Sequence, residues 1–296
     1  MLAEIYSFLE IKELKVTSSK NKTINKQPTS INQFKDFLNT PPIWENTQFG
    51  IKQFEFPAVD LSDFTPTPIP GNLRLGHQME IVCKQLLANS SRFEILVFNL
   101  PIREGKQTLG EIDFILKDVE TEQLIHVELT YKFYIIDPNI SEPIHQLIGP
   151  NKRDAFFMKM EKIKNKQFTL LHSEAGKKAL ANLDIDASNL VHQTCFKVQL
   201  FKPYKADIVQ LEPLNENCVV GYWLRMSGFT GDAFTSYQFY MPNKSQWVLT
   251  PNDTFEWMSY ADIVLKIEQQ LVKQNSPLIW MKKSESEYEK FFVVWW

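Results

Sequence analysis

Two acidic residues and a lysine lie in neighbouring apolar segments of this 296-residue chain. Asp113 lies in residues 110–114 (GEIDF), and Glu128 and Lys132 lie in residues 125–132 (IHVELTYK). A hard divalent cation such as Mg²⁺ takes one or two carboxylates and keeps waters for substrate phosphates. A lysine beside such an ion can orient or deprotonate the attacking water and balance charge on the phosphate. These residue types therefore indicate metal-assisted hydrolysis of a phosphodiester.

The segments that carry these residues are expected to be β-strands. Residues 93–99, 111–116 and 124–133 are rich in Ile, Val, Leu and Phe, and polar, turn-prone connectors separate them. Short apolar runs bounded in this way predict strands. Three strands that follow each other so closely predict a meander.

Side-chain alternation along these strands gathers the charged groups. Glu111 and Asp113 share one face of their strand, and Glu128, Thr130 and Lys132 share one face of the next. The two charged sets can therefore face each other. The alternative is that the acids are edge-strand surface residues paired with lysines, which requires a solvated face because an unpaired buried carboxylate is costly.

Residues 75–88 (LGHQMEIVCKQLLA) are expected to form an amphipathic helix that carries another acid. Apolar residues recur at positions 75, 79, 82, 83, 86 and 87, the spacing of one helix face. Glu80 lies at the edge of this stripe. By itself such an acid is most often a solvated flanking residue.

A basic region follows the strands. Residues 151–178 hold eight basic and three acidic residues, and Phe156, Phe157, Met160, Ile163 and Phe168 keep an apolar helix face. Net charge of −3 excludes a protein that binds polyanions with its whole surface, so any nucleic-acid contact must be local. The candidate contact residues are Lys152, Arg153, Lys159 and Lys162, although a solvated helix face is the alternative.

Further elements are expected on both sides of this central part. Residues 191–203 alternate as a fourth core strand, and residues 219–226, 236–240 and 246–249 as later strands. A helix is expected at 262–272, and residues 17–33 are a polar loop or linker. The segment 291–296 (FFVVWW) is either a buried closing strand or a partner contact, for example in a homodimer.

The cysteines and histidines give weaker indications. Cys83, Cys195 and Cys218 are far apart and lack paired metal-binding spacing, which favours a reducing compartment and no zinc ribbon. His126 shares the face of Glu128, either as a supporting hydrogen-bond partner or as an ordinary strand histidine. The chain shows no cleavable signal peptide and no apolar run of about 20 residues, so we expect a cytoplasmic protein without membrane contact.

In order and spacing these residues resemble the PD-(D/E)XK nuclease superfamily, which has the restriction-endonuclease-like fold. More closely, the chain looks like an uncharacterised bacterial domain-of-unknown-function family assigned to that superfamily. The similarity spans about residues 70 to 175. The matching phrases are Leu75-Gly76 with Glu80, residues 108–113 (TLGEID), residues 126–129 (HVEL) with 132–134 (KFY), and residues 149–154 (GPNKRD).

The resemblance implies an α/β fold with a core of one helix, a three-strand meander, a helix and a fourth strand, in a mixed sheet flanked by helices. It places this core at 71–205, after an N-terminal arm and linker at 1–70 and before a C-terminal α+β, β-rich extension with one helix at 206–296. It also implies an Mg²⁺-dependent nuclease, with Mn²⁺ as a second candidate ion. In that interpretation Asp113, Glu128 and Glu80 bind the metal and, with Lys132, form the catalytic set.

One position departs from the superfamily pattern. The lysine normally lies two residues after the second acid, where Thr130 stands here. Lys132 lies two positions further along the same face, about 13 Å of backbone from Glu128 unless the strand bulges. Two functions therefore stay open: a nuclease with a displaced lysine, and an inactive nuclease-like module for nucleic-acid binding or assembly. The sequence does not indicate DNA or RNA, strandedness or sequence specificity.

Overall fold

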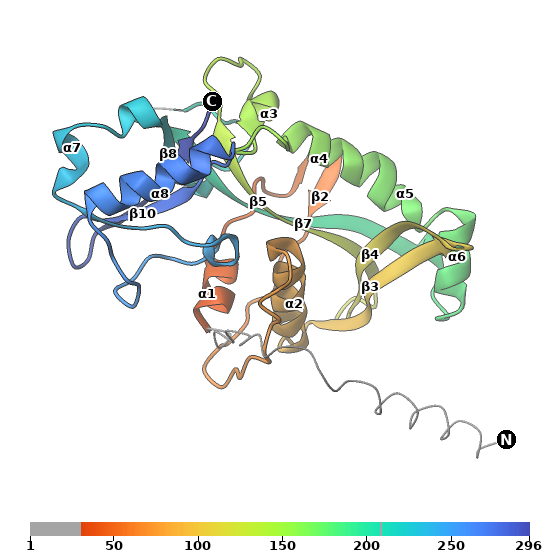
Figure 1. The fold of residues 1–296 in the computed structure, drawn as a ribbon. Coiled ribbons are helices and arrows are strands. Elements are labelled where there is room, and N and C mark those ends of the chain that lie inside the picture. Colours follow the sequence, from red (N-terminus) through yellow and green to blue (C-terminus); the bar gives the residue numbers. More distant parts are fainter. Residues whose placement is uncertain (1–30, 208) are drawn as a thin grey trace, which may run out of the picture.

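The computed structural model describes residues 31–207 and 209–296 of the chain. These residues form a mixed sheet of 11 strands with helices packed on both faces, as Figure 1 shows. The α/β fold class expected from the sequence is therefore confirmed at this level. The polar loop expected at 17–33, and the first part of the N-terminal arm, lie outside the described residues apart from their last positions.

The elements begin and end at the following residues. The α-helices are α1 (Ile31–Asn39), α2 (Leu75–Ala88), α3 (Pro143–Gln146), α4 (Phe156–Lys162), α5 (Phe168–Leu170), α6 (Glu174–Ala181), α7 (Asp232–Thr235) and α8 (Tyr260–Val272). The strands are β1 (Thr47–Gln48), β2 (Ile51–Gln53), β3 (Phe93–Glu104), β4 (Gln107–Asp118), β5 (Leu124–Ile136), β6 (Leu147–Ile148), β7 (Leu190–Pro203), β8 (Val219–Arg225), β9 (Gln238–Tyr240), β10 (Leu278–Lys282) and β11 (Tyr288–Val294). A π-helical turn, η2 (Ile163–Gln167), joins α4 to α5.

The central part has the predicted element order. Strands β3, β4 and β5 form an antiparallel meander after α2, and β7 pairs in parallel with β5 after the α4–α6 region. The helix predicted at 75–88 coincides with α2. The strands are longer than predicted, because their alternation continues through polar residues at both ends. This element order assigns no activity by itself.

The C-terminal part continues the same sheet. Strand β8 pairs in parallel with β7 and β11, and β10 and β9 follow in antiparallel pairing. The closing strand expected at 291–296 is present as β11, whose last four residues are buried. The strand expected at 246–249 is wrong. A capping box between Asn243 and Gln246 starts a 3₁₀ turn at Lys244–Gln246 there instead.

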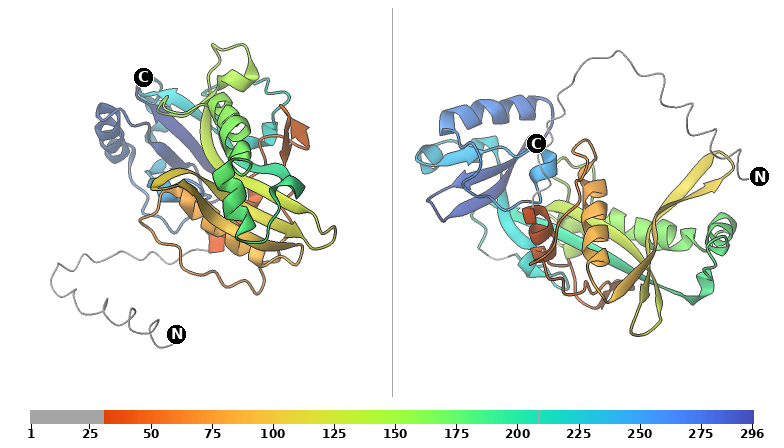
Figure 2. Two further views of the ribbon diagram at one scale, coloured as in Figure 1. Left: turned by 90° about the vertical axis from the view of Figure 1, so that its right-hand side faces the viewer. Right: turned by 90° about the horizontal axis from the view of Figure 1, so that it is seen from below.

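Helices cover the two faces of the sheet with separate cores. On one face α1 and α2 pack against odd-numbered β5 residues such as Val127 and Leu129. On the other face α4 packs against even-numbered residues such as Tyr134. Figure 2 shows this layered arrangement from two further sides. Since side chains alternate along a strand, each β5 residue is assigned to one helical layer.

The β3–β4 hairpin leaves the sheet part of the way along its length. Pairing between β4 and β5 runs only from Lys117↔Leu124 to Phe114↔Val127. Beyond this point the hairpin packs with α6 around Ile112, Leu171 and Leu180 (Figures 1 and 2). Two strands therefore diverge at the next pair of residues, Asp113 and Glu128.

None of the helices within residues 31–207 and 209–296 has the length and hydropathy needed to cross a membrane.

Candidate carboxylate site

Asp113 and Glu128 face each other where β4 and β5 separate. They come directly after the last paired residues of the two strands. Here the Leu129 backbone N–H donates to Asp113 Oδ2 at 2.9 Å. The Asp113 side chain thus takes the place of a backbone acceptor where β4 and β5 no longer pair. The Asp113 carboxyl group also lies within hydrogen-bonding reach of Glu128. The structure thus brings the two predicted metal ligands together.

Both carboxyl groups are removed from solvent. Glu128 is 0% exposed and Asp113 is 8% exposed. Burial raises the pKa of both carboxyl groups, and the negative charge of Glu128 raises the pKa of Asp113 further. The alternative in which these acids lie on a solvated strand face is therefore excluded. A buried pair of like charges favours either a shared proton or a bound cation.

Glu80 approaches this pair from α2. Its Oε2 accepts a hydrogen bond from Asn99 Nδ2 at 2.9 Å and lies 3.0 Å from His77 Nδ1. Its negative charge contributes to the raised pKa of Asp113 and to that of half-buried Glu111. Glu80 therefore belongs to the same acidic cluster, although Asn99 and His77 hold its carboxylate.

Lys132 points to a different acid. Its amine forms an ion pair with Asp154, and both side chains are 35% exposed. Thr130 lies between Lys132 and Glu128 on the same strand face, and its buried hydroxyl has no hydrogen-bond partner among the described residues. The lysine predicted for the site is therefore held beside Asp154.

The amine whose positive charge stabilises the ionised form of both acids belongs to Lys159. Its Nζ donates to Gln167 Oε1 at 2.9 Å, and Gln167 Nε2 donates in turn to Glu128 Oε2. The positive charge of Lys159 lowers the pKa of both Asp113 and Glu128 against the effect of burial. Burial lowers the pKa of Lys159 itself, and Glu128 and Asp113 oppose that change. Lys159 and the two acids form one electrostatic unit.

The position of Lys159 on its helix explains this placement. Phe156 and Ile163 are buried on the face of α4 that meets the sheet. Lys159 lies three residues after the first and four before the second, so it lies within the apolar stripe. The sequence pattern, in contrast, predicts Lys159 among the solvent-facing basic residues of this region. Its spacing from the apolar residues of the helix is the sequence signal that distinguishes Lys159 from Lys162, which is exposed.

A π-helical turn brings Gln167 to the same place. Residues Ile163–Gln167 follow α4 with π-helical hydrogen bonding. The wider turn shifts the following side chains around the helix axis, a feature found often at functional sites. Gln167, which sequence reasoning did not single out, thereby bridges Lys159 and Glu128.

His126 supports Glu128 from within the same strand. Its ring is fully buried, and its Nε2 lies 3.0 Å from Glu128 Oε1. Burial lowers the pKa of His126 to about 3, which keeps the ring neutral. The supporting hydrogen bond considered in the sequence analysis is therefore present.

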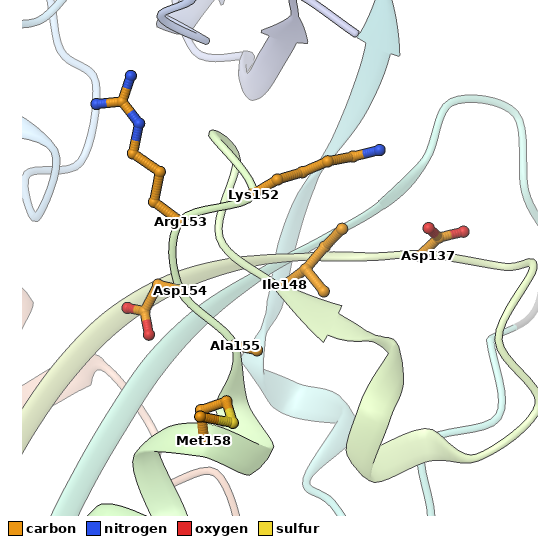
Figure 3. Close-up of a pocket in the computed structure, with 7 residues that line it drawn as sticks. All are labelled: Asp137, Ile148, Lys152, Arg153, Asp154, Ala155 and Met158. Carbon is orange, nitrogen blue, oxygen red and sulfur yellow. The ribbon is translucent and has the colours of Figure 1, made fainter.

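Lys152 and Arg153 lie on an exposed loop beside a surface pocket of about 480 Å³. Figure 3 shows both basic side chains extending from this loop, with Asp137 across the opening. Neither Asp113 nor Glu128 lines this pocket. Asp154, which also lines the pocket, forms the ion pair with Lys132.

The donor set fits a two-carboxylate Mg²⁺ site. Within the described residues no group of three or more His, Cys, Asp and Glu side chains is arranged to hold a metal ion. Mg²⁺ needs only one or two protein carboxylates, because it retains several waters. The repulsion between Asp113 and Glu128 is also what a divalent cation would relieve. These two residues would hold the ion, with Glu80 beside them.

Fold and site together define a mixed α/β protein with a buried carboxylate pair and an adjacent, partly buried amine. The chain belongs to the family described as "Domain of unknown function (DUF1853)", whose model matches residues 35–294. This range contains all the site residues named above. The resemblance to a domain-of-unknown-function family is thereby confirmed. No curated protein and no solved structure matches the chain.

Proposed function

We propose that this protein is a metal-dependent nuclease that hydrolyses phosphodiester bonds in nucleic acid and is related to the PD-(D/E)XK superfamily. The observation that carries the proposal is the buried pair of Asp113 and Glu128, which meet from adjacent strands with the amine of Lys159 acting on both. Two ionised carboxylates without solvent repel each other, and a bound divalent cation relieves that repulsion.

The two acids hold Mg²⁺ or Mn²⁺ in this proposal. The bound ion supplies charge stabilisation for the phosphate and lowers the pKa of a coordinated water. Lys159 balances negative charge at the reacting phosphate and stabilises the ionised form of both acids. It takes the role that the sequence pattern assigned to Lys132. Glu80 would add negative charge beside the pair, which favours a cation there.

The nucleic acid is contacted by basic side chains that surround the acids. Lys132 contributes charge to the environment of Lys159 and of Lys244, which follows the core in sequence. Exposed Lys152, Arg153 and Lys162 extend this basic surface. Phosphate contacts of this kind position a substrate without reading its sequence.

An inactive nucleic-acid-binding or assembly module is the second candidate. Two observations favour it: Thr130 occupies the usual lysine position, and Lys132 is held by Asp154. In this alternative the buried pair keeps a shared proton and binds no cation. Nucleic acid then binds to the basic surface without being cleaved.

Cleavage by matched variants tests the proposal. Purified protein is incubated with single-stranded, duplex and structured DNA and RNA in Mg²⁺ or Mn²⁺. We expect Asp113→Asn, Glu128→Gln and Lys159→Met each to lower the cleavage rate by about 100-fold or more. Glu174→Gln is the control, because the Glu174 side chain is 94% exposed.

Two outcomes oppose the nuclease assignment. Equal cleavage by the wild type and Asp113→Asn would show that a contaminant or another site does the chemistry. Absence of cleavage together with absence of Mn²⁺ binding in a calorimeter, while nucleic acid still binds, would establish the inactive module instead.

A further inference from the structure

Three of the five histidines lie in a row that leads from Glu128 to the surface. His126 Nε2 lies 3.0 Å from Glu128 Oε1, and His126 Nδ1 lies 2.9 Å from His192 Nδ1. His192 Nε2 then lies 2.9 Å from His172 Nε2. The rings come from β5, from β7 and from the turn between α5 and α6. His126 is buried, His192 is half-buried and His172 is exposed.

A neutral imidazole has one N–H donor and one acceptor nitrogen, so each contact in the row fixes the next. When Glu128 is ionised it only accepts, and His126 therefore donates through Nε2. His126 Nδ1 must then accept from His192 Nδ1, and His192 Nε2 must accept from His172 Nε2. Every ring in the row donates toward Glu128.

The other oxygen of Glu128 is fixed by the same kind of argument. An ammonium group can only donate, so Lys159 determines that Gln167 presents its oxygen to the amine. The Gln167 amide nitrogen consequently donates to Glu128 Oε2. Glu128 thus accepts a donor on each oxygen, from opposite ends of its carboxylate.

Packing holds the row in place. Phe168 stacks on the His192 ring with centroids 4.9 Å apart and planes at 22°, and it meets the His126 ring edge-on. His172 and His192 also meet edge-on, at 5.1 Å. Their orientations are therefore set by contacts from two separate elements.

We propose that His192 and His172 are positioning residues for the carboxylate site, acting through His126 to hold the Glu128 carboxylate in the orientation that receives a divalent cation beside Asp113. The inference rests on the proposed metal site and adds residues that no part of that proposal uses. Partners that orient a metal ligand typically change metal affinity by about 10- to 100-fold when removed.

The full-length protein, labelled with ¹⁵N only at histidine, gives the direct test of the donor directions. Ring-nitrogen spectra at pH 8.5, with and without Mg²⁺, distinguish the protonated nitrogen of each ring. We expect protonation at Nε2 in His126, at Nδ1 in His192 and at Nε2 in His172. The opposite set of tautomers would overturn the proposal.

A matched pair of variants tests whether the row acts on the cation. His192→Asn keeps an N–H close to the position of Nδ1, whereas His192→Leu removes it. By calorimetry with Mn²⁺ we expect His192→Leu to weaken binding by about 10- to 100-fold and His192→Asn to stay within about threefold of the wild type. His172→Gln and His172→Leu form the same comparison at the outer ring.

His145→Leu is the control, because exposed His145 lies outside the row. Thermal unfolding of each variant shows whether the fold is retained. Wild-type binding of Mn²⁺ with an unchanged affinity in His192→Leu would overturn this inference alone. A wild type that binds no Mn²⁺ would overturn both this inference and the proposed function.

Discussion

At the scale of single residues, Glu128 is the group on which the site depends. It has no exposed surface, yet it contacts His126 and Gln167 and lies within the field of Lys159. A buried carboxylate without such partners would cost several kcal/mol. These contacts therefore keep an ionisable group in an environment that otherwise favours its neutral form.

The pH dependence of stability follows from this balance. Burial raises the pKa of Glu128 from its usual 4.5 to about 7 in the folded protein. The folded state then holds a proton that the unfolded chain has released, so metal-free stability falls as pH rises from about 4.5 through about 7 and levels off above that. Glu128→Gln removes this loss. We expect the variant to melt on the order of 2–4 °C above the wild type at pH 8 and at the same temperature at pH 4.5.

Thermal unfolding in metal-free buffer across this pH range measures the effect, with exposed Glu174→Gln as the control. Mg²⁺ should raise the melting temperature of the wild type at pH 8 and leave that of Glu128→Gln unchanged, since a ligand stabilises only the state that binds it. Parallel melting curves for wild type and Glu128→Gln at every pH would contradict the assigned pKa shift.

At the scale of elements, the joint between the central and C-terminal strands is tightly packed. Strand β8 lies between β7 and β11, and at Gly221 the backbone of Lys290 in β11 fills the space that a side chain would need. A Cβ atom at this position would lie 2.1 Å from the Lys290 carbonyl oxygen and 3.1 Å from Phe201 Cδ1. No side chain larger than hydrogen fits without a shift of β8 or β11.

We therefore expect Gly221→Ala to destabilise the protein by about 1–3 kcal/mol, the usual cost of overpacking. Gly228→Ala is the matched control, because its Cβ would meet no atom nearer than 3.5 Å. Urea unfolding followed by tryptophan fluorescence measures the difference. Equal midpoints for the two variants would show that β8 has room to adjust.

At the scale of the whole molecule, charge is distributed unevenly. Net charge is −3, while eight basic residues lie between positions 151 and 178. Association with nucleic acid should therefore depend on that local surface and weaken with salt. Each phosphate neutralised on duplex DNA contributes about −0.9 to the slope of log K against log salt.

The double variant Lys152→Gln/Arg153→Gln tests the location of this surface. We expect it to reduce the magnitude of the salt slope by about two and to weaken binding to all sequences equally. The control is Lys266→Gln/Lys273→Gln, which removes the same charge from exposed positions at α8. Fluorescence anisotropy with labelled duplex from about 50 to 200 mM salt measures both, and the same loss of slope in the control would rule out a local contact.

Much of the fold was predictable because its signals are local. Apolar spacing predicted α2 to the residue, apolar runs bounded by polar connectors predicted β3, β4 and β5, and alternation predicted β7. The rule that side chains alternate also predicted that Asp113 and Glu128 would face each other. Strand β10 was not predicted, and the 246–249 segment was wrong because the Asn243 capping box outweighs its apolar residues.

The sequence by itself thus determined the central helix and strands and the pairing of the two acids, since both depend on neighbours within a few positions. Only the tertiary structure decided which lysine lies near Asp113 and Glu128. Packing of α4 brings the Lys159 amine close enough to lower the pKa of Glu128, while Asp154 holds the Lys132 amine in an ion pair. The tertiary structure also aligned His126 with His192, which are 66 residues apart. Such pairings depend on how β5 and β7 register and how α5 packs, and no local pattern encodes those distances.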